Sequence, residues 1–126
     1  MRHAMTAAGT ALLLGCAPTP SDLADERALA EARPIGEPID CLLTTEIRDT
    51  QVRDEATIDF NLRNGQVYRN RLPDSCPGLG FNGAFSYRPA ISRLCSIDTI
   101  TVLNSGGVPG PTCGLGSFQR VEAGAP

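Results

Sequence analysis

The cysteines constrain the fold of this chain more than any other feature. Four of its five cysteines are spread over residues 41–113, at Cys41, Cys76, Cys95 and Cys113, and none forms a C-x-x-C pair. An even set of this kind is typical of two disulfides in an oxidising compartment, and it disfavours a zinc or redox site. Of the three pairings that four cysteines allow, we favour Cys76–Cys95, which would close the central loop. Cys41–Cys113 would then join the first and last strands.

The fifth cysteine, Cys16, follows a stretch that has the features of an export signal. Residues 1–15 combine a basic start at Arg2, an uncharged apolar run over residues 4–14 and the small residue Gly15. The run is too short to cross a bilayer, which needs about 20 residues. We therefore interpret residues 1–15 as a signal peptide.

The run Leu13-Leu14-Gly15-Cys16 resembles the bacterial lipobox, in which a lipid is attached to the cysteine and cleavage occurs just before it. This resemblance predicts that Cys16 becomes the lipid-bearing first residue of the mature chain. The diacylglycerol on such a cysteine would anchor the protein stably in a membrane. Ala17, rather than Asp, after the cysteine favours the periplasmic face of the outer membrane. An ordinary secretory signal cut after Ala17 is the alternative.

The ionisable residues of the mature chain exclude several chemistries. The chain has no lysine, and its single histidine, His3, would leave with the signal peptide. A Ser-His or Cys-His couple, a Schiff-base lysine and the commonest zinc ligand would then all be missing. Removing Arg2 from 11 basic residues leaves 10 against 14 acids, a net charge near −4 that gives no support to nucleic-acid binding. We expect a non-catalytic protein with no cofactor and no metal site.

Residues 16–40 are predicted to be the lipidated cysteine and a tether that holds the domain away from the membrane. A short helix is expected after Thr19, because Pro20 suits the first helical position and Asp22 the first turn. Pro34 is expected to end it. A helix docked on the domain is the alternative.

Residues 41–121 are predicted to form one small β domain, and residues 122–126 a disordered C-terminal tail. Short strand-like runs separated by Gly/Pro-rich turns are typical of antiparallel sheets. We expect an all-β fold, either a small antiparallel barrel or a strongly curved sheet of about 5–6 strands, with two disulfides. The expected strands cover residues 44–52, 57–62, 66–70, 85–87, 97–103 and 115–121, with loops over 72–83 and 104–111 and one helical turn over 91–94.

The pair Asn64-Gly65, between two strand-like runs, is the strongest hairpin signal in the chain. A two-residue turn would place Phe60 opposite Arg69. A three-residue loop with a left-handed glycine instead pairs Phe60 with Tyr68 and Asp59 with Arg69. Aromatic and opposite-charge pairs across strands are both favourable, so we predict the three-residue loop.

Arginines gather in the second half of the chain, which is net positive although the whole chain is acidic. Arg69, Arg71, Arg88 and Arg93 are predicted as a patch for an anionic ligand, such as lipid headgroups or cell-wall carboxylates. The alternative is that these arginines pair with acids on neighbouring strands, as Asp59 with Arg69 suggests. Convergence of the four on one concave face would favour the patch.

Three other patterns have ordinary structural interpretations. Residues 78–83 match G-x-G-x-x-G but lack the preceding strand and following helix of a dinucleotide site. The acids Asp49, Asp54 and Glu55 lie around a turn, but they do not have the spacing of an EF-hand calcium loop. The remaining aromatic group is expected to pack in the core and at its rim rather than to stack on bases: Tyr68, Phe85 and Tyr87.

The β domain resembles a family of small uncharacterised proteobacterial lipoproteins, a domain of unknown function with four cysteines. The resemblance covers roughly residues 39–121 and implies no activity, so it implies no catalytic residues. It is carried by the runs Tyr68-Arg69-Asn70-Arg71-Leu72-Pro73, Cys76-Pro77-Gly78-Leu79, Phe85-Ser86-Tyr87, Leu94-Cys95-Ser96-Ile97-Asp98-Thr99-Ile100 and Cys113-Gly114-Leu115-Gly116-Ser117-Phe118.

These observations together predict a non-catalytic envelope lipoprotein with a structural or protein-interaction role. Its expected partners are the membrane, through the N-terminal lipid, and an envelope protein, but not nucleic acid. A binding module for an anionic ligand, using the arginine patch, is the first alternative. A carboxylate-dependent hydrolase is the second, and it would need two acids about 5–9.5 Å apart across a cleft.

Overall fold

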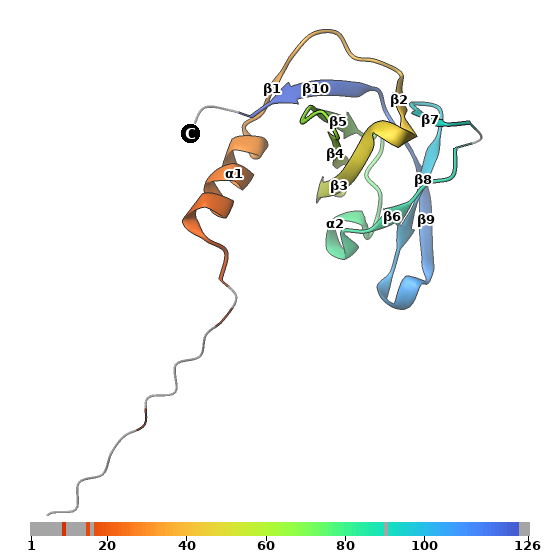
Figure 1. The fold of residues 1–126 in the computed structure, drawn as a ribbon. Helices are drawn as coiled ribbons and strands as arrows, with labels where there is room; N and C mark the ends of the chain where they lie inside the picture. The colour runs from red at the N-terminus through yellow and green to blue at the C-terminus, as the bar shows by residue number, and fades with distance from the viewer. Residues whose placement is uncertain (1–8, 10–14, 16, 90, 124–126) are drawn as a thin grey trace, which may run out of the picture.

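The computed structural model describes residues 9, 15, 17–89 and 91–123, and within them the chain is mostly antiparallel β-structure with few helices (Figure 1). The elements follow in the order α1 (Pro20–Ala30), β1 (Arg33–Pro34), β2 (Cys41–Leu43), η1 (Thr44–Glu46), β3 (Ile47–Asp54), β4 (Thr57–Leu62), β5 (Val67–Arg71), α2 (Leu79–Asn82), β6 (Phe85–Ser86), β7 (Arg93–Cys95), β8 (Thr99–Leu103), η2 (Ser105–Gly107), β9 (Pro109–Gly114) and β10 (Phe118–Glu122).

The strands form a five-stranded sheet and two smaller ones. The large sheet has the order β1-β10-β5-β4-β3, the pair β2-β7 stands by itself, and a three-stranded sheet has the order β6-β8-β9. The all-β prediction is confirmed, but the sheets are not closed into a barrel.

The β4–β5 hairpin has the predicted register. Phe60 lies opposite Tyr68, and Asp59 lies opposite Arg69. The loop between the strands bends at Gly65, whose φ of +88° is readily adopted only by glycine. The predicted three-residue loop is therefore confirmed.

The core lies between the large sheet and the cysteine-bearing strands. Phe60 of β4 is fully buried and meets Phe118 of β10 edge to face, with ring centroids 5.3 Å apart. Ile100 and Val102 of β8 are buried in the same cluster. The alternation in β4 sends Ile58, Phe60 and Leu62 into this cluster, as the sequence predicts.

A buried asparagine fixes where β10 approaches β5. Asn70 is fully buried, its amide nitrogen donates to the carbonyl of Gly116 at 2.7 Å, and its amide oxygen accepts from the Gly116 N–H at 2.8 Å. A side chain at Gly116 would collide with the carbonyl of Arg71. These contacts hold the residue after Gly116, Ser117, beside β5.

The structure pairs all four described cysteines, but not in the predicted way. The disulfides are Cys41–Cys95 and Cys76–Cys113, so the predicted pairs Cys76–Cys95 and Cys41–Cys113 are wrong. The cause is β2, which is no part of the large sheet and instead places Cys41 opposite Cys95 on β7. Cys113 on β9 is then left for Cys76.

The segment predicted as a tether divides into two parts. α1 begins as predicted, with Thr19 as its N-cap: the Thr19 side chain accepts from the Asp22 N–H, and Asp22 caps the Thr19 N–H in return. β1 then pairs with β10, and Ile39 bridges to Phe118. Residues 33–39 are therefore part of the fold, and the domain begins before the predicted boundary at residue 41.

Several local predictions are wrong for identifiable reasons. The expected helical turn over residues 91–94 is replaced by β7, because Leu94 is fully buried opposite β2. Strand β9 occupies part of the expected loop over residues 104–111. An edge strand tolerates its two prolines, and Gly110 leaves room for the Val102 carbonyl. β10 extends to Glu122, the first residue of the predicted tail.

Candidate functional site

A buried carboxylate, Asp59, binds two arginines on the face of the large sheet that points away from the core. Asp59 alternates with the core residues of β4 and is nevertheless fully buried. Its Oδ1 accepts from Arg69 Nε at 2.7 Å, and its Oδ2 accepts from Arg69 Nη2 at 2.9 Å. Arg53 Nε, on β3, also donates to Oδ2, at 2.8 Å. A buried carboxylate is tolerated here because two guanidinium groups hold it.

The ion-pair cluster of Asp59, Arg53 and Arg69 also holds the end of α1 on the sheet. Arg69 Nη2 also donates to the carbonyl oxygen of Leu29, at 2.7 Å, near the C-terminus of α1. A cation at this end of a helix is favourable, because the last carbonyls carry partial negative charge. The hydrogen bond to Asp59 raises the pKa of Arg69, while burial acts in the opposite direction.

The cluster has more positive than negative charge. Two arginines share the single carboxylate of Asp59, and Arg53 Nη2 is buried with no hydrogen-bond partner among the residues that the structure describes. Two residues along β5 from Arg69, the exposed Arg71 takes part in no ion pair among the described side chains. Because residues two apart in a strand share a face, Arg71 adds a third guanidinium to this side of the sheet.

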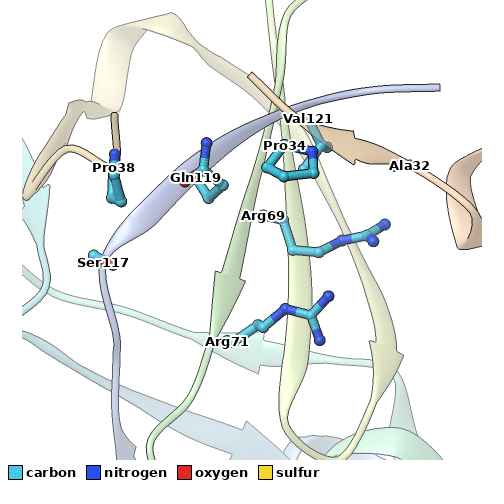
Figure 2. A pocket seen from close by; sticks show the side chains of 8 residues that line it. All are labelled: Ala32, Pro34, Pro38, Arg69, Arg71, Ser117, Gln119 and Val121. Carbon is cyan, nitrogen blue, oxygen red and sulfur yellow. The ribbon is translucent and has the colours of Figure 1, made fainter. Parts of the chain in front are cut away.

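A pocket of about 300 Å³ lies beside these arginines. Figure 2 shows the side chains of Arg69 and Arg71 extending in the same direction from β5, with Pro34 of β1 next to Arg69. Gln119 donates its amide protons to the carbonyls of Ile35 and Gly36, which holds the segment after β1 in place. The lining residues are Ala32, Pro34, Pro38, Arg69, Arg71, Ser117, Gln119 and Val121.

The structure brings together only two of the four arginines predicted as a patch. Arg69 and Arg71 line this pocket. Arg88 lines a separate, more open hollow of about 590 Å³ with Tyr87 and Asp98, and Arg93 lies exposed on β7. Arg69 also forms the predicted ion pair with Asp59, so the alternative interpretation, pairing with acids on neighbouring strands, is confirmed for this arginine. The anionic-ligand patch stays a prediction.

The acids around the turn that lacks EF-hand spacing have partners within the fold. Asp49 accepts from Asn61 at 2.6 Å and from Arg48 at 3.0 Å, and these bonds, the Asn61 bond first, lower its pKa. Asp54 accepts from the Ala56 N–H within the β3–β4 turn. In the part of the chain that the structure describes, no group of three His, Cys, Asp or Glu side chains is arranged to hold a metal.

The other sequence patterns also have structural roles. Gly78 and Gly83 flank the short helix α2 with positive φ angles. The preceding strand, β5, already ends at Arg71 and does not lead directly into Gly78, so residues 78–83 do not form a dinucleotide fingerprint. The aromatic group lies partly buried against the core: Tyr68, Phe85 and Tyr87.

Sequence reasoning missed the residues that complete the site. Arg53 could have been found by pairing β3 with β4, because that register places its strand beside Asp59. Pro34 and Pro38 carry no local signal of a binding role. They line the pocket only because β1 pairs with β10.

Cys16 and nearly all of the predicted signal peptide lie outside the described residues. Among the described helices, none has the length and apolar character needed to span a membrane.

No protein-family model, curated protein or solved structure matches this chain. A functional assignment therefore depends on the chain's own residues, and the pocket beside Arg71 is the site with the clearest chemistry.

Proposed function

We propose that this chain is a lipid-anchored, non-catalytic domain of the bacterial envelope that works by binding an envelope partner. Cys16 carries the lipid, on the periplasmic face of the outer membrane. α1 and its flanking residues connect the anchor to the β domain, which presents the pocket beside Arg71 to the partner.

The observation that carries this proposal is the pairing of Cys41, Cys76, Cys95 and Cys113 into two disulfides. Disulfides persist in oxidising compartments such as the bacterial periplasm and are rare in the cytosol. An exported chain is therefore the natural setting for these bridges. The remaining cysteine, Cys16, stands where a lipobox would place it.

A binding role is favoured over catalysis by the state of the buried acid. Both oxygens of Asp59 accept hydrogen bonds from guanidinium groups, its side chain is fully buried, and Asp59 is not among the residues that line the pocket. A carboxylate-dependent hydrolase needs a second acid facing the first across a cleft. Among the residues that the structure describes, no acid lines the pocket beside Arg71.

The anchor is tested by acyl labelling in bacterial cells. Wild-type chain should incorporate a clickable palmitate, and Cys16→Ser should not. The variant should also retain the signal peptide, seen as a slower band on a gel. Unchanged labelling of Cys16→Ser would contradict the lipid assignment.

The binding role is tested by site-specific photo-crosslinking in the same cells. A photoreactive residue at Pro38, in the pocket wall, should yield a discrete crosslinked envelope protein. The same residue at Thr112, exposed on β9, is the matched control and should not. Equal crosslinking at both positions, or none at Pro38, would count against a partner at this pocket.

A further inference from the structure

Arg71, on the outer face of the large sheet, has no carboxylate partner among the described side chains. Arg53, Arg69 and Arg71 share that face with the buried carboxylate of Asp59 and with Asp54, whose charge also acts on Arg69. The carboxylate of Glu122, at the end of β10, already lies 3.7 Å from Arg33. An anion that approached Arg71 would therefore meet a guanidinium with no competing ion pair among the described side chains.

The pocket next to this charge is lined largely by apolar groups. Pro34, Pro38 and Val121 contribute ring and methyl carbons, and Arg69 and Arg71 contribute the aliphatic stems of their side chains (Figure 2). The volume of about 300 Å³ is at the lower end of the range for small-molecule sites. Such a pocket suits a small apolar group better than a sugar or a long acyl chain.

Two polar side chains complete the pocket. Gln119 uses its amide nitrogen on the carbonyls of Ile35, Gly36 and Arg120, and its amide oxygen accepts no hydrogen bond from the described residues. Ser117 contributes an exposed hydroxyl. The pocket therefore offers a cation, a fixed acceptor and a hydroxyl around an apolar wall.

We propose that this pocket binds the C-terminal carboxylate of a peptide whose last residues are small and apolar. This assignment rests on the proposed binding role, but not on the lipid anchor. The carboxylate pairs with the guanidinium of Arg71, the small side chain packs against Pro34 and Pro38, and the last peptide N–H donates to the amide oxygen of Gln119. A planar carboxylate matches one guanidinium through two parallel hydrogen bonds.

The test is a binding titration on the full chain carrying Cys16→Ser, which removes the site of lipid attachment. The probes are N-acetyl-Ala-Ala with a free carboxylate and the same peptide with a C-terminal amide, followed by calorimetry and by NMR shifts of the Ser117 and Gln119 amides. The free acid should bind and move these signals. The amide should bind at least about tenfold more weakly, because a hydrogen bond to a charged group is lost.

Two substitutions separate the pocket from the general charge of the protein. Arg71→Gln should weaken binding of the free acid about tenfold to a hundredfold. Arg93→Gln removes an exposed arginine outside the pocket and should leave the affinity unchanged. Ser117→Ala should produce a smaller loss, and thermal unfolding checks that each variant is folded.

Inorganic phosphate is the third probe. If phosphate binds as tightly as the free acid, the pocket is a general oxyanion site rather than a site for a peptide carboxylate, and the proposal is overturned. Equal affinity for acid and amide, unchanged affinity in Arg71→Gln, or no binding of the free acid would also overturn it. If crosslinking from Pro38 persists in any of these cases, the binding role stands and only the ligand assignment fails.

Discussion

Two parts of the molecule, the large sheet and a cystine-bearing part, are held together by different means. The cystine-bearing part consists of β2, β6, β7, β8 and β9 with the loop around Cys76. Four strands of the large sheet have five to eight residues each, and none carries a cysteine. In the cystine-bearing part β2, β6 and β7 have only two or three residues each. A long strand makes enough ladder bonds to define its position, and a very short one does not.

This difference indicates where each region gets its stability. The large sheet combines backbone ladders with the buried ion pairs of Asp59. The cystine-bearing part depends on Cys41–Cys95, which joins β2 to β7, and on Cys76–Cys113, which joins the loop around Cys76 to β9. Substitutions in one region should therefore weaken that region first.

The largest effect should come from a disulfide. Replacing both Cys76 and Cys113 with serine should cost about 4 kcal/mol, because the bridge removes conformational entropy from the unfolded chain. Guanidinium unfolding measures the loss, and amide exchange should accelerate in β8 and β9 before β4 and β5. Non-reducing peptide mapping must first show that Cys41–Cys95 survives in the variant. Equal stability of variant and wild type would contradict the dependence on this bridge.

The next effect should arise in the large sheet, at Asp59. Asp59→Asn keeps the shape but leaves two buried guanidinium groups without their carboxylate, which should cost about 3 kcal/mol or more. Urea unfolding measures this change. The matched control is Asp49→Asn on the neighbouring strand, where an exposed carboxylate should cost less than about 1 kcal/mol. Similar costs for the two substitutions would show that the buried cluster has no special role.

A smaller and local effect is expected at the cap of α1. Thr19→Ala removes the side-chain acceptor for the Asp22 N–H, and such losses cost about 1 kcal/mol. Amide exchange in α1 should become roughly fivefold faster while exchange in β4 stays unchanged. Serine at the same position should restore the cap. Acceleration throughout the large sheet would mean that α1 is an integral part of that sheet's cooperative unit.

The smallest effect concerns acid at the edge of the large sheet. The pKa of Asp49 lies below its ordinary value of 3.8, chiefly because Asn61 donates to it. The folded state therefore favours the carboxylate form, so this contribution is present above about pH 4 and is lost as the pH falls through the lowered pKa. The effect should be well under about 1 kcal/mol because the group is exposed.

Asn61→Ala tests this directly. An NMR titration of the Asp49 carboxyl should show its pKa rising toward the ordinary value. The stability difference between variant and wild type should shrink as the pH falls from 5 to 2. A difference that is constant over this range would assign the loss to packing rather than to the carboxylate.

The parts of the fold that could be predicted from sequence are those set by neighbours along the chain. The β4–β5 hairpin follows from Asn64-Gly65 and from the pairing preferences of Asp59 and Phe60. The cap of α1 follows from Thr19 and Pro20. In both cases the interacting residues lie within about a dozen positions of one another, so periodicity and turn chemistry suffice.

The disulfide partners and the pocket could not be predicted in this way. Cys41 meets Cys95 because a three-residue strand finds its partner 54 residues away, and so short a strand has no pattern of its own. The pocket depends equally on distant pairing, since Pro34 reaches Val121 through β1 and β10. The arginine pattern identified Arg69 and Arg71 correctly as neighbours, but it could not exclude Arg88 and Arg93 from the same surface.

The disulfide connectivity has a consequence for how the chain matures. Counting from Cys41, the first cysteine pairs with the third and the second with the fourth, so each covalent loop contains one end of the other. A chain that enters an oxidising compartment N-terminus first exposes Cys41 and Cys76 before either native partner, and a bond between those two is excluded from the final fold. The β4–β5 hairpin lies between them and contains no cysteine, so it can form in about 1–10 μs, long before thiols exchange. That hairpin can therefore be in place before the later cysteines are oxidised into their native pairs.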